Sequence, residues 1–493
     1  MTTATAKRAT GQSLPARGNL IAGKWVPASD GRTLEVVSPS DGEIFATIAR
    51  GTARDVDAAV AAARKAFEEG AWRRLTAVER GRLMMKLGQK ILDHFDELAE
   101  LEARDTGKPM KQARADITAA ARYFEYYGAA ADKVHGETVP FLDGYMVTIL
   151  REPHGVTGHI IPWNYPAQMF GRSLAPALAM GNATVIKPAE EACMTPVRLA
   201  ELAMEAGFPE GAINLVTGIG EEAGAALSTH PDINFISFTG SPEVGTLIQT
   251  AAARNHIACV LELGGKSPQI LFDDCDIDAV VPVAVNAIVQ NGGQTCSAGS
   301  RLLIQRSVYD TCMRRIAERF NQLRVGSHTM DLDCGPLISE SQKKRVQGFV
   351  NQAITDKVPV LAEGKIADGT PAGGYYIAPV LFGPVPRDNN LACEEVFGPV
   401  LSAIPFEDEA DAVKLANSTD YGLVAGIWTR DGGRQMRVAK AMRCGQVFVN
   451  GYGAGGGIEL PFGGVKKSGH GREKGFQALH ELSATKTIVF KHG

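Results

Sequence analysis

The sequence lacks an apolar run long enough to cross a lipid bilayer. Its longest such stretch, AVVPVAVNAIV at 279–289, is interrupted by Asn286, whereas a membrane-spanning helix needs about 20 residues. Residues 1–18 have no continuous hydrophobic core, which argues against a secretory signal and leaves a disordered tail or a transit peptide as interpretations. We expect a cytoplasmic protein that does not bind membranes.

An excess of basic residues is also missing. The 51 lysines and arginines are balanced by 55 acidic residues and are spread along the chain, so we expect no surface for a nucleic-acid backbone. Hydrophobic residues make up 45% and charged residues 22% of the 493 positions, which is typical of a globular enzyme with two or three domains.

No CxxC pair or zinc-type spacing occurs among the eight cysteines, so we expect reduced thiols and no metal site. One of them, Cys296, lies in NGGQTCSAGSR at 291–301, among glycines and small hydroxyl residues. A structural cysteine is usually a buried apolar residue, whereas a nucleophile must be reachable and deprotonated. The surroundings of Cys296 favour chemistry, although small residues also flank cysteines in ordinary loops.

Strand and helix patterns alternate along most of the chain. Residues 54–127 have helical periodicity, with a capping box at Thr76 and Glu79, and we interpret this part as packing rather than chemistry. Between 155 and 272, β-rich runs such as VTGHII, ATVIK and INFISFTG alternate with helical stretches, and a second series follows residue 273. This pattern predicts two α/β sheets with a ligand cleft between two lobes.

Two glycine-containing stretches compete as a dinucleotide site. TGIGEEAG at 217–224 has a glycine spacing one residue longer than GxGxxG, so it is a weak match. FTGSPEVG at 238–245 opens a helix, with Gly240 and Ser241 at the turn and Pro242 at the first helical position. Such a helix start offers free backbone amides to a pyrophosphate.

A third stretch, KPAE at 187–190, follows the strand-like run ATVI. The carboxyl edge of an open α/β sheet is where ligands bind, so Lys187 and Glu190 are candidates to bracket a ribose. A carboxylate that accepts from the 2′-hydroxyl repels a 2′-phosphate, which favours NAD over NADP. An exposed Lys/Glu pair at a helix start is the alternative interpretation.

Several stretches resemble, in order and in approximate spacing, the motifs of the NAD(P)-dependent aldehyde dehydrogenase superfamily. They are KPAE and FTGSPEVG together with PWNYP (162–166), ELGGKSP (262–268), GGQTCSAGSR (292–301), EEVFGPV (394–400) and PFGGVKKSGHGRE (461–473). The resemblance covers nearly the whole chain from about residue 20. It implies an α/β, aldehyde dehydrogenase-like fold with a Rossmann-type cofactor-binding domain, a second α/β catalytic domain and a small β oligomerisation arm.

The resemblance also implies how the chain is divided. Residues 1–18 are the expected tail, 19–134 and 154–261 the NAD-binding domain, 262–460 the catalytic domain, and 135–153 with 480–493 the arm and C-terminal strand. Family members are dimers or tetramers that pair through such an arm and strand. Because KTIVF near the C-terminus would otherwise be an unpaired exposed strand, we expect a homodimer or a homotetramer.

The catalytic roles follow from the same resemblance. Cys296 is the implied nucleophile, and its backbone amide and the side-chain amide of Asn164 would hold the oxyanion. Glu262 is the implied base that activates water on the thioester. Because Glu262 ends the apolar run ACVLEL, we expect partial desolvation to raise its pKa toward that of a useful base.

The implied cofactor is NAD, with NADP as an alternative. Phosphate binding is assigned to the FTGS turn, which makes TGIGEEAG a decoy. Trp163 is ambiguous, since its backbone would lie near the cofactor while its indole could pack in the core. The implied cofactor contacts are Lys187, Glu190, Gly240, Ser241, Gly265, Glu395, Phe397, Trp163, Ile161 and Pro162.

The implied substrate pocket contains Tyr165, Met169, Arg172, Gln290, Thr295 and Ser297. Arg172 stands where succinic semialdehyde dehydrogenases have a carboxylate-binding arginine, but Gln290 replaces their second arginine, and an arginine that packs on its own helix is an equal alternative. We therefore predict oxidation of broad, aromatic or medium-chain aldehydes. A semialdehyde dehydrogenase, a CoA-acylating dehydrogenase and a catalytically silent scaffold protein are the alternatives, and an intact set of Cys296, Asn164 and Glu262 disfavours the last two.

Overall fold

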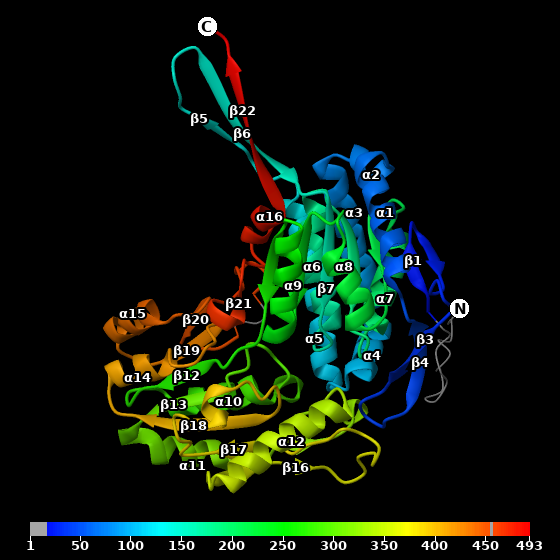
Figure 1. Ribbon diagram of the computed structural model, residues 1–493. Helices are drawn as coiled ribbons and strands as arrows, with labels where there is room; N and C mark the ends of the chain where they lie inside the picture. The colour runs from blue at the N-terminus through cyan, green and yellow to red at the C-terminus, as the bar shows by residue number, and fades with distance from the viewer. Residues whose placement is uncertain (1–16, 454–456) are drawn as a thin grey trace, which may run out of the picture.

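The structure, a computed structural model, describes residues 17–453 and 457–493. Figure 1 shows two α/β lobes and a long β arm that projects from one of them. Most of the predicted tail at 1–18 lies outside the described residues, as do residues 454–456, which belong to the glycine-rich sequence YGAGGG at 452–457. In the described part of the chain, no helix combines the length and apolarity needed to span a bilayer.

The first lobe is built on a sheet with the strand order β2-β1-β9-β8-β7-β10-β11-β21. Its central strands β9, β8, β7, β10 and β11 run parallel, while β1 and β21 join the two sides antiparallel. Every residue of the run VTGHII is buried, as expected for a parallel sheet covered on both faces. The strands are β1 (Asn19–Ile21), β2 (Lys24–Val26), β7 (Val156–Ile161), β8 (Ala183–Pro188), β9 (Ile213–Leu215), β10 (Phe235–Thr239), β11 (Ala258–Glu262) and β21 (Gly469–His470).

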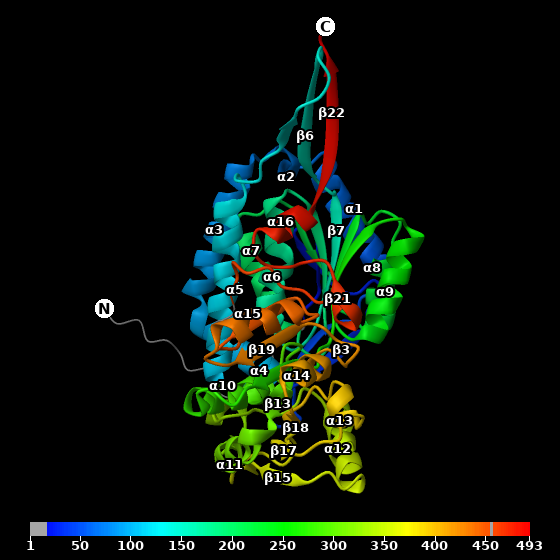
Figure 2. The same cartoon turned by 90° about the vertical axis from the view of Figure 1, so that its left-hand side faces the viewer.

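Helices cover both faces of this sheet. Figure 2 shows α1, α8 and α9 on one side of β7 and α3, α5 and α6 on the other. The capping box at Thr76 and Glu79 is confirmed, because Thr76 accepts from the backbone of Glu79 and the Glu79 carboxylate bonds back to Thr76. The helices of this lobe are α1 (Ala53–Glu68), α2 (Ala71–Arg74), α3 (Ala77–Asp93), α4 (Phe95–Thr106), α5 (Met110–Ala130), α6 (Pro166–Ala179), α7 (Met194–Ala206), α8 (Ala225–Thr229) and α9 (Pro242–Arg254). A hairpin of β3 (Thr33–Val37) and β4 (Ile44–Ala49) lies outside the sheet.

The second lobe has a sheet with the order β15-β17-β18-β13-β12-β19-β20, parallel except for β15. Its strands are β12 (Pro268–Leu271), β13 (Arg301–Gln305), β15 (Val360–Glu363), β17 (Val380–Phe382), β18 (Val400–Phe406), β19 (Val424–Trp428) and β20 (Gln446–Val449), with β14 (Arg324–Val325) and β16 (Lys365–Ile366) paired separately. The helices are α10 (Ile277–Val289), α11 (Tyr309–Phe320), α12 (Glu340–Thr355), α13 (Asn390–Cys393), α14 (Glu409–Ala416) and α15 (Gly432–Ala441).

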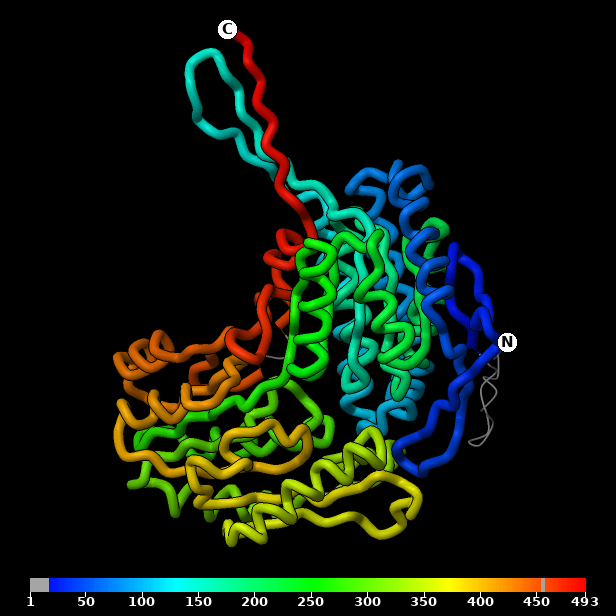
Figure 3. Tube along the Cα trace, viewed as in Figure 1, coloured from blue at the N-terminus to red at the C-terminus, as the bar shows by residue number. Residues whose placement is uncertain are grey.

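Two segments connect the lobes. ELGGKSP leads from the last residue of β11 directly into β12, so the sheets are joined by the backbone of 263–267. The returning segment 461–473 lies beside it, because β21 pairs with β11 and the amide of Leu263 donates to Ser468. Figure 3 follows this second segment from the second lobe to α16 (Gln477–Glu481) at the base of the arm. The junction between the sheets is therefore made of predicted motif residues.

The arm consists of β5 (Glu137–Val139), β6 (Tyr145–Pro153) and β22 (Ser483–Lys491), in the order β22-β6-β5. β22 pairs with β6 along its whole length, from Ser483 with Pro153 to Lys491 with Tyr145. The C-terminal strand therefore runs along the hairpin and away from both lobes (Figure 1).

Candidate active site

The loop that carries Cys296 follows α10 and has an unusual backbone. Asn291, Gly292 and Gly293 have φ values of 52°, 62° and 74°, a region that glycine adopts without strain. A Cβ on Gly293 would lie 2.1 Å from the carbonyl oxygen of Gly398. These glycines are therefore required for the shape and packing of the loop, in addition to the space around the thiol that the sequence suggested.

Cys296 is half-buried and packs against Leu423, Val424 and Phe462. Burial raises the pKa of its thiol to about 11, with Arg172 opposing the shift. The thiol is therefore neutral near pH 7 and needs a base or a nearby positive charge to become a nucleophile. All eight cysteines are free.

Asn164 lies directly behind this loop. Its side-chain nitrogen Nδ2 donates to the backbone oxygen of Gln294 at 3.0 Å. Its own backbone oxygen accepts from Asn291 Nδ2 at 2.9 Å and from Lys108 Nζ at 3.0 Å. The backbone oxygen and the side-chain amide of Asn164 are thus both held. The side-chain amide is held on Gln294, which precedes Cys296 by two residues in the sequence.

Glu262 is the last residue of β11, and only 2% of it is exposed. Neither carboxylate oxygen accepts a hydrogen bond from the residues that the structure describes. Burial raises the pKa of Glu262 well above its usual range, while Arg172 acts in the opposite direction. The predicted desolvation is therefore confirmed. A Cβ on Gly265, three residues further along, would lie 2.4 Å from the Cys296 backbone oxygen, so the segment that follows Glu262 contacts the nucleophile loop.

Arg172, on α6, faces two carboxylates. Its Nη2 atom lies 3.4 Å from Glu262 Oε2 and its Nε atom 2.5 Å from Glu473 Oε2. The guanidinium also stacks over the ring of Phe462, 4.5 Å from the centroid. Burial opposes the charge, but Glu473 and Glu262 raise the pKa of Arg172 above its usual range. The arginine therefore binds two carboxylates of the chain itself, an arrangement that the sequence did not indicate.

The KPAE pair forms as a contact. Lys187 Nζ lies 2.6 Å from Glu190 Oε2, and the backbone amide of Gly220 donates to Glu190 Oε1 at 3.2 Å. TGIGEEAG therefore lies beside the pair. Its Glu222 is bound by Arg50 and Arg32.

The FTGS turn begins α9 in the predicted way. Ser241 is the N-cap and accepts from the amide of Val244, and Pro242 occupies the first turn. The amide of Gly240 donates to the backbone oxygen of Glu262 at 3.1 Å. The helix start and the candidate base are thus tied together by the backbone.

Glu395 and Phe397 lie against the junction between the lobes. The amide of Gly265 donates to Glu395 Oε1 at 2.8 Å, and a Cβ on Gly264 would lie 2.2 Å from Glu395 Oε2. Burial raises the pKa of Glu395 to about 7. The ring of Phe397 meets Trp163 edge-on at 5.4 Å, so the indole contacts another candidate cofactor residue.

Of the other predicted positions, three make hydrogen bonds near the nucleophile loop, and four differ in how far they are buried. Tyr165 donates to or accepts from Thr295 at 2.7 Å, and the carbonyl of Ser297 accepts from Tyr452 at 2.8 Å. The remaining positions are Ile161 and Met169, which are buried, Pro162, which is half-buried, and Gln290, which is exposed.

These groups suit a dinucleotide. A partly exposed carboxylate beside a lysine, a capped helix start, and a carboxylate with raised pKa in a glycine cradle match two riboses and a pyrophosphate. In residues 17–453 and 457–493, no cluster of three or more His, Cys, Asp or Glu is arranged to hold a metal ion.

Sequence reasoning missed Lys108, Tyr452 and Glu473. Each contacts the site through the fold: Lys108 binds Asn164, Tyr452 binds Ser297, and Glu473 binds Arg172. Glu473 stood in a quoted motif without a role. Lys108 lies in DTGKP at 105–109, within the segment 54–127 that we interpreted as packing, and no local pattern marked it.

Comparisons with known proteins show the family of the chain. The profile described as Aldehyde dehydrogenase family matches residues 25–488. The chain belongs to this family. It is an NAD(P)-dependent aldehyde dehydrogenase, an oxidoreductase that acts on aldehydes.

Relatives of this aldehyde dehydrogenase extend over nearly its full length. It is 41% identical to an aldehyde dehydrogenase of Emericella nidulans, over 97% of this chain and 95% of that protein. A crystal structure from Burkholderia cenocepacia, named provisionally as an aldehyde dehydrogenase, is 61% identical with a TM-score of 0.96, over 97% of this chain and 100% of that one. An NAD+ complex of the Bacillus cereus enzyme is 38% identical with a TM-score of 0.94, over 97% of each chain. The predicted fold class is confirmed.

Proposed function

We propose that this enzyme oxidises an uncharged aldehyde to the free acid through a thioester at Cys296, with NAD preferred as cofactor. One observation carries the proposal. A buried carboxylate, Glu262, accepts no hydrogen bond from the described residues and lies at the segment that contacts the Cys296 loop. A carboxylate in that state is suited to take a proton from water.

The first step is the attack of Cys296 on the carbonyl carbon. Arg172 opposes the effect of burial on the pKa of the thiol, and the thiol gives its proton to a base as the sulfur attacks. The carbonyl oxygen becomes an oxyanion, and the Asn164 side-chain amide has a second hydrogen that donates to it, since the first is held by Gln294. Fixed donors of this kind stabilise charge that develops in the transition state.

The cofactor site would use Lys187 and Glu190 at one ribose, the α9 start at the pyrophosphate, and Glu395 at the other ribose. A bound nicotinamide would supply the acceptor for the hydride, a proton with two electrons, that leaves the former aldehyde carbon. Glu190 supports NAD over NADP, because its carboxylate can accept from a 2′-hydroxyl and repels a 2′-phosphate.

The last step is hydrolysis of the thioester. Glu262 takes a proton from water, the resulting hydroxide attacks the acyl carbon, and the Cys296 sulfur leaves. A carboxylate with raised pKa holds that proton well near neutral pH. Transfer of the acyl group to coenzyme A would need no such base, so hydrolysis is favoured over the CoA-acylating alternative.

The substrate class follows from Arg172. Its charge is used by Glu262 and Glu473, which leaves no uncompensated cation there for the carboxylate of a semialdehyde. Relatives at similar identity are named for benzaldehyde in Antirrhinum majus and for retinal in humans. Both are uncharged aldehydes and benzaldehyde is aromatic, which supports an uncharged substrate for this enzyme.

The test compares kcat/KM for succinic semialdehyde, benzaldehyde and hexanal with NAD at one pH. We expect benzaldehyde or hexanal to exceed succinic semialdehyde. A preference for succinic semialdehyde of about 100-fold, or about 3 kcal/mol of transition-state binding, would contradict the proposal. The same assay with NADP is expected to give the lower kcat/KM of the two cofactors.

A further inference from the structure

A fully buried lysine, Lys108, binds the backbone of Asn164, the candidate donor to the oxyanion. Lys108 occupies the turn between α4 and α5, and its side chain is 0% exposed. Its ammonium binds the carboxylate of Asp116 and that of Glu102, the latter at 3.2 Å. A third bond, 3.0 Å long, goes to the backbone oxygen of Asn164.

The number of hydrogens on the Lys108 ammonium shows why the third bond, to Asn164, has a fixed position. A buried cation is costly unless it is paired and hydrogen-bonded, and the two carboxylates already supply the pairing. An ammonium has three hydrogens and no acceptor, so two carboxylates and one carbonyl satisfy it completely. The carbonyl of Asn164 is therefore held by a donor that has a fixed position of its own.

The same short segment contacts both sides of the junction between the lobes. Lys108 Nζ lies 4.5 Å from the ring centroid of Tyr165, whose hydroxyl bonds to Thr295. Four residues after Lys108, Gln112 Oε1 accepts from the amide of Asn291 at 2.9 Å. Segment 108–112 thus binds the residue pair 164–165 and the start of the nucleophile loop.

The orientation of Asn164 is over-determined as a result. Its backbone oxygen has two donors, Lys108 and Asn291, and its side-chain amide is fixed on Gln294. With these ends held, the remaining amide hydrogen has one direction. A donor that is oriented before the reaction stabilises an oxyanion without reorganising.

We propose that Lys108 is a positioning residue that orients Asn164 toward the oxyanion formed at Cys296. The inference rests on the role proposed above for Asn164, and it assigns a function to DTGKP, which the sequence suggested was packing alone. Lys108 acts through Asn164 and does not touch the substrate.

Removal of the charge needs a matched background. Lys108→Met alone would leave two buried carboxylates, Glu102 and Asp116, without a counter-charge, so we compare Asp116→Asn with the double variant Lys108→Met/Asp116→Asn. In the double variant only Glu102 remains, and because burial raises its pKa, this group can take up a proton and become neutral. Both lack the Asp116 charge, and one keeps the bond to Asn164. The readout is the rate of NADH formation in a single turnover with saturating NAD, and we expect the double variant to be slower by about 10- to 100-fold. The NAD dissociation constant is expected to differ by less than about twofold, since Lys108 lies outside the candidate cofactor contacts.

A double-mutant cycle separates positioning from general weakening of the fold. The same pair is made with Asn164→Ala added, and the loss caused by Lys108→Met is measured again. If Lys108 acts through the Asn164 side chain, this second loss should shrink to less than about twofold. Equal losses with and without Asn164, or no loss in the first pair, would overturn the proposal.

The cycle also distinguishes two kinds of failure. If Asn164→Ala leaves the single-turnover rate unchanged, the proposed oxyanion role is wrong and the positioning role falls with it. If Asn164→Ala slows the reaction but the cycle is additive, only the role of Lys108 is wrong. Should the methionine variant not fold, Lys108→Leu in the Asp116→Asn background takes its place, because leucine is also neutral and cannot donate to the Asn164 carbonyl.

Discussion

At the scale of single residues, one charged side chain, that of Arg172, influences several ionisable groups of the site. Arg172 faces Glu262 and Glu473, and it lowers the pKa of both Glu262 and Cys296 against the effect of burial. Burial favours the neutral forms of the base and of the nucleophile, whereas the reaction needs each of them charged at some step. One permanently charged arginine therefore bears on both proposed catalytic groups.

Replacement of Arg172 by leucine should move the acid limb of the pH–rate profile to higher pH. Both pKa values are already raised by burial, and removal of the cation raises them further, so less carboxylate and less thiolate are present at a given pH. At pH 7 we expect kcat to fall by at least about tenfold. The measurement is kcat between pH 6 and 10, with Arg306→Leu, which loses an exposed ion pair to Glu407, as the control. An acid limb at the same pH in both variants would contradict this reading.

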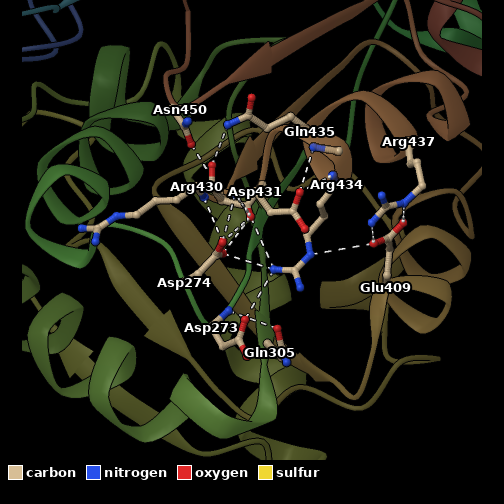
Figure 4. A network of polar contacts seen from close by, with 12 residues as sticks. Asp273, Asp274, Gln305, Glu409, Arg430, Asp431, Arg434, Gln435, Arg437 and Asn450 are labelled. Carbon is tan, nitrogen blue, oxygen red and sulfur yellow. Dashed lines mark hydrogen bonds and ion pairs between the residues drawn. The ribbon is translucent and has the colours of Figure 1, made fainter.

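At the scale of elements, the second lobe contains a polar junction that fixes one end of its sheet. Figure 4 shows Asp274, just after β12, in contact with Arg430, Asp431 and Arg434 at the start of α15. Its carboxylate accepts from the Thr429 hydroxyl at 2.7 Å and from the amides of Arg430 and Asp431, each at 3.1 Å. Although burial raises it, these bonds lower the pKa of Asp274. The strand β12 that follows ELGGKSP is thereby tied to its neighbour β19.

Asp274→Ala should reduce the free energy of unfolding by about 2–3 kcal/mol, since backbone amides and a hydroxyl lose a charged acceptor. A carboxylate with lowered pKa stabilises the fold above its unfolded pKa and loses that contribution as the pH falls through its folded pKa. The difference between wild type and variant, measured by urea unfolding, should therefore be largest near pH 7 and shrink below about pH 4. Glu407→Ala, which removes an exposed ion pair, is the control and should cost less than about 1 kcal/mol. A pH-independent difference would refute the role of the charge.

At the scale of the whole molecule, the sequence predicted the α/β fold class and the two sheets, because buried parallel strands and crossover helices have strong local periodicity. It also predicted that Glu262 is partly desolvated, since the apolar run ACVLEL is typical of a buried strand. What it could not predict are contacts between distant segments. Lys108 and Asn164 are 56 residues apart and Gly293 contacts Gly398, and nothing local to either partner encodes such a pairing. The partners of Arg172 were missed for the same reason.

The exposed apolar residues of the arm indicate that copies of this chain associate with one another. It projects from the first lobe (Figure 1), and its exposed side chains include Phe141, Leu142, Val489 and Phe490, at 62%, 63%, 53% and 46%. Val489 and Phe490 lie on β22, an outer strand of the arm sheet, and Phe141 and Leu142 lie in the loop between β5 and β6. Exposed apolar residues on a strand edge and at a loop beside it are suited to bury against a second copy. We propose a homodimer or a homotetramer built on this arm.

Deletion of residues 483–493, which removes β22, should therefore lower the molar mass of the assembly in sedimentation velocity. Deletion of 492–493 alone leaves β22 intact and is expected to keep the wild-type mass. A wild-type protein that sediments as a monomer at micromolar concentration would contradict the proposal, as would a deletion variant that keeps the full assembly.

The most direct test of the proposed chemistry is the mass of the acyl-enzyme. Glu262→Gln, incubated with NAD and benzaldehyde, should form about one NADH per subunit and then stop, because the thioester forms but water is not activated. Peptide mass spectrometry should find the benzoyl group on Cys296, and Cys296→Ala/Glu262→Gln should carry none while it still binds NAD. An acyl group on another cysteine, or continued turnover without an adduct, would contradict the account.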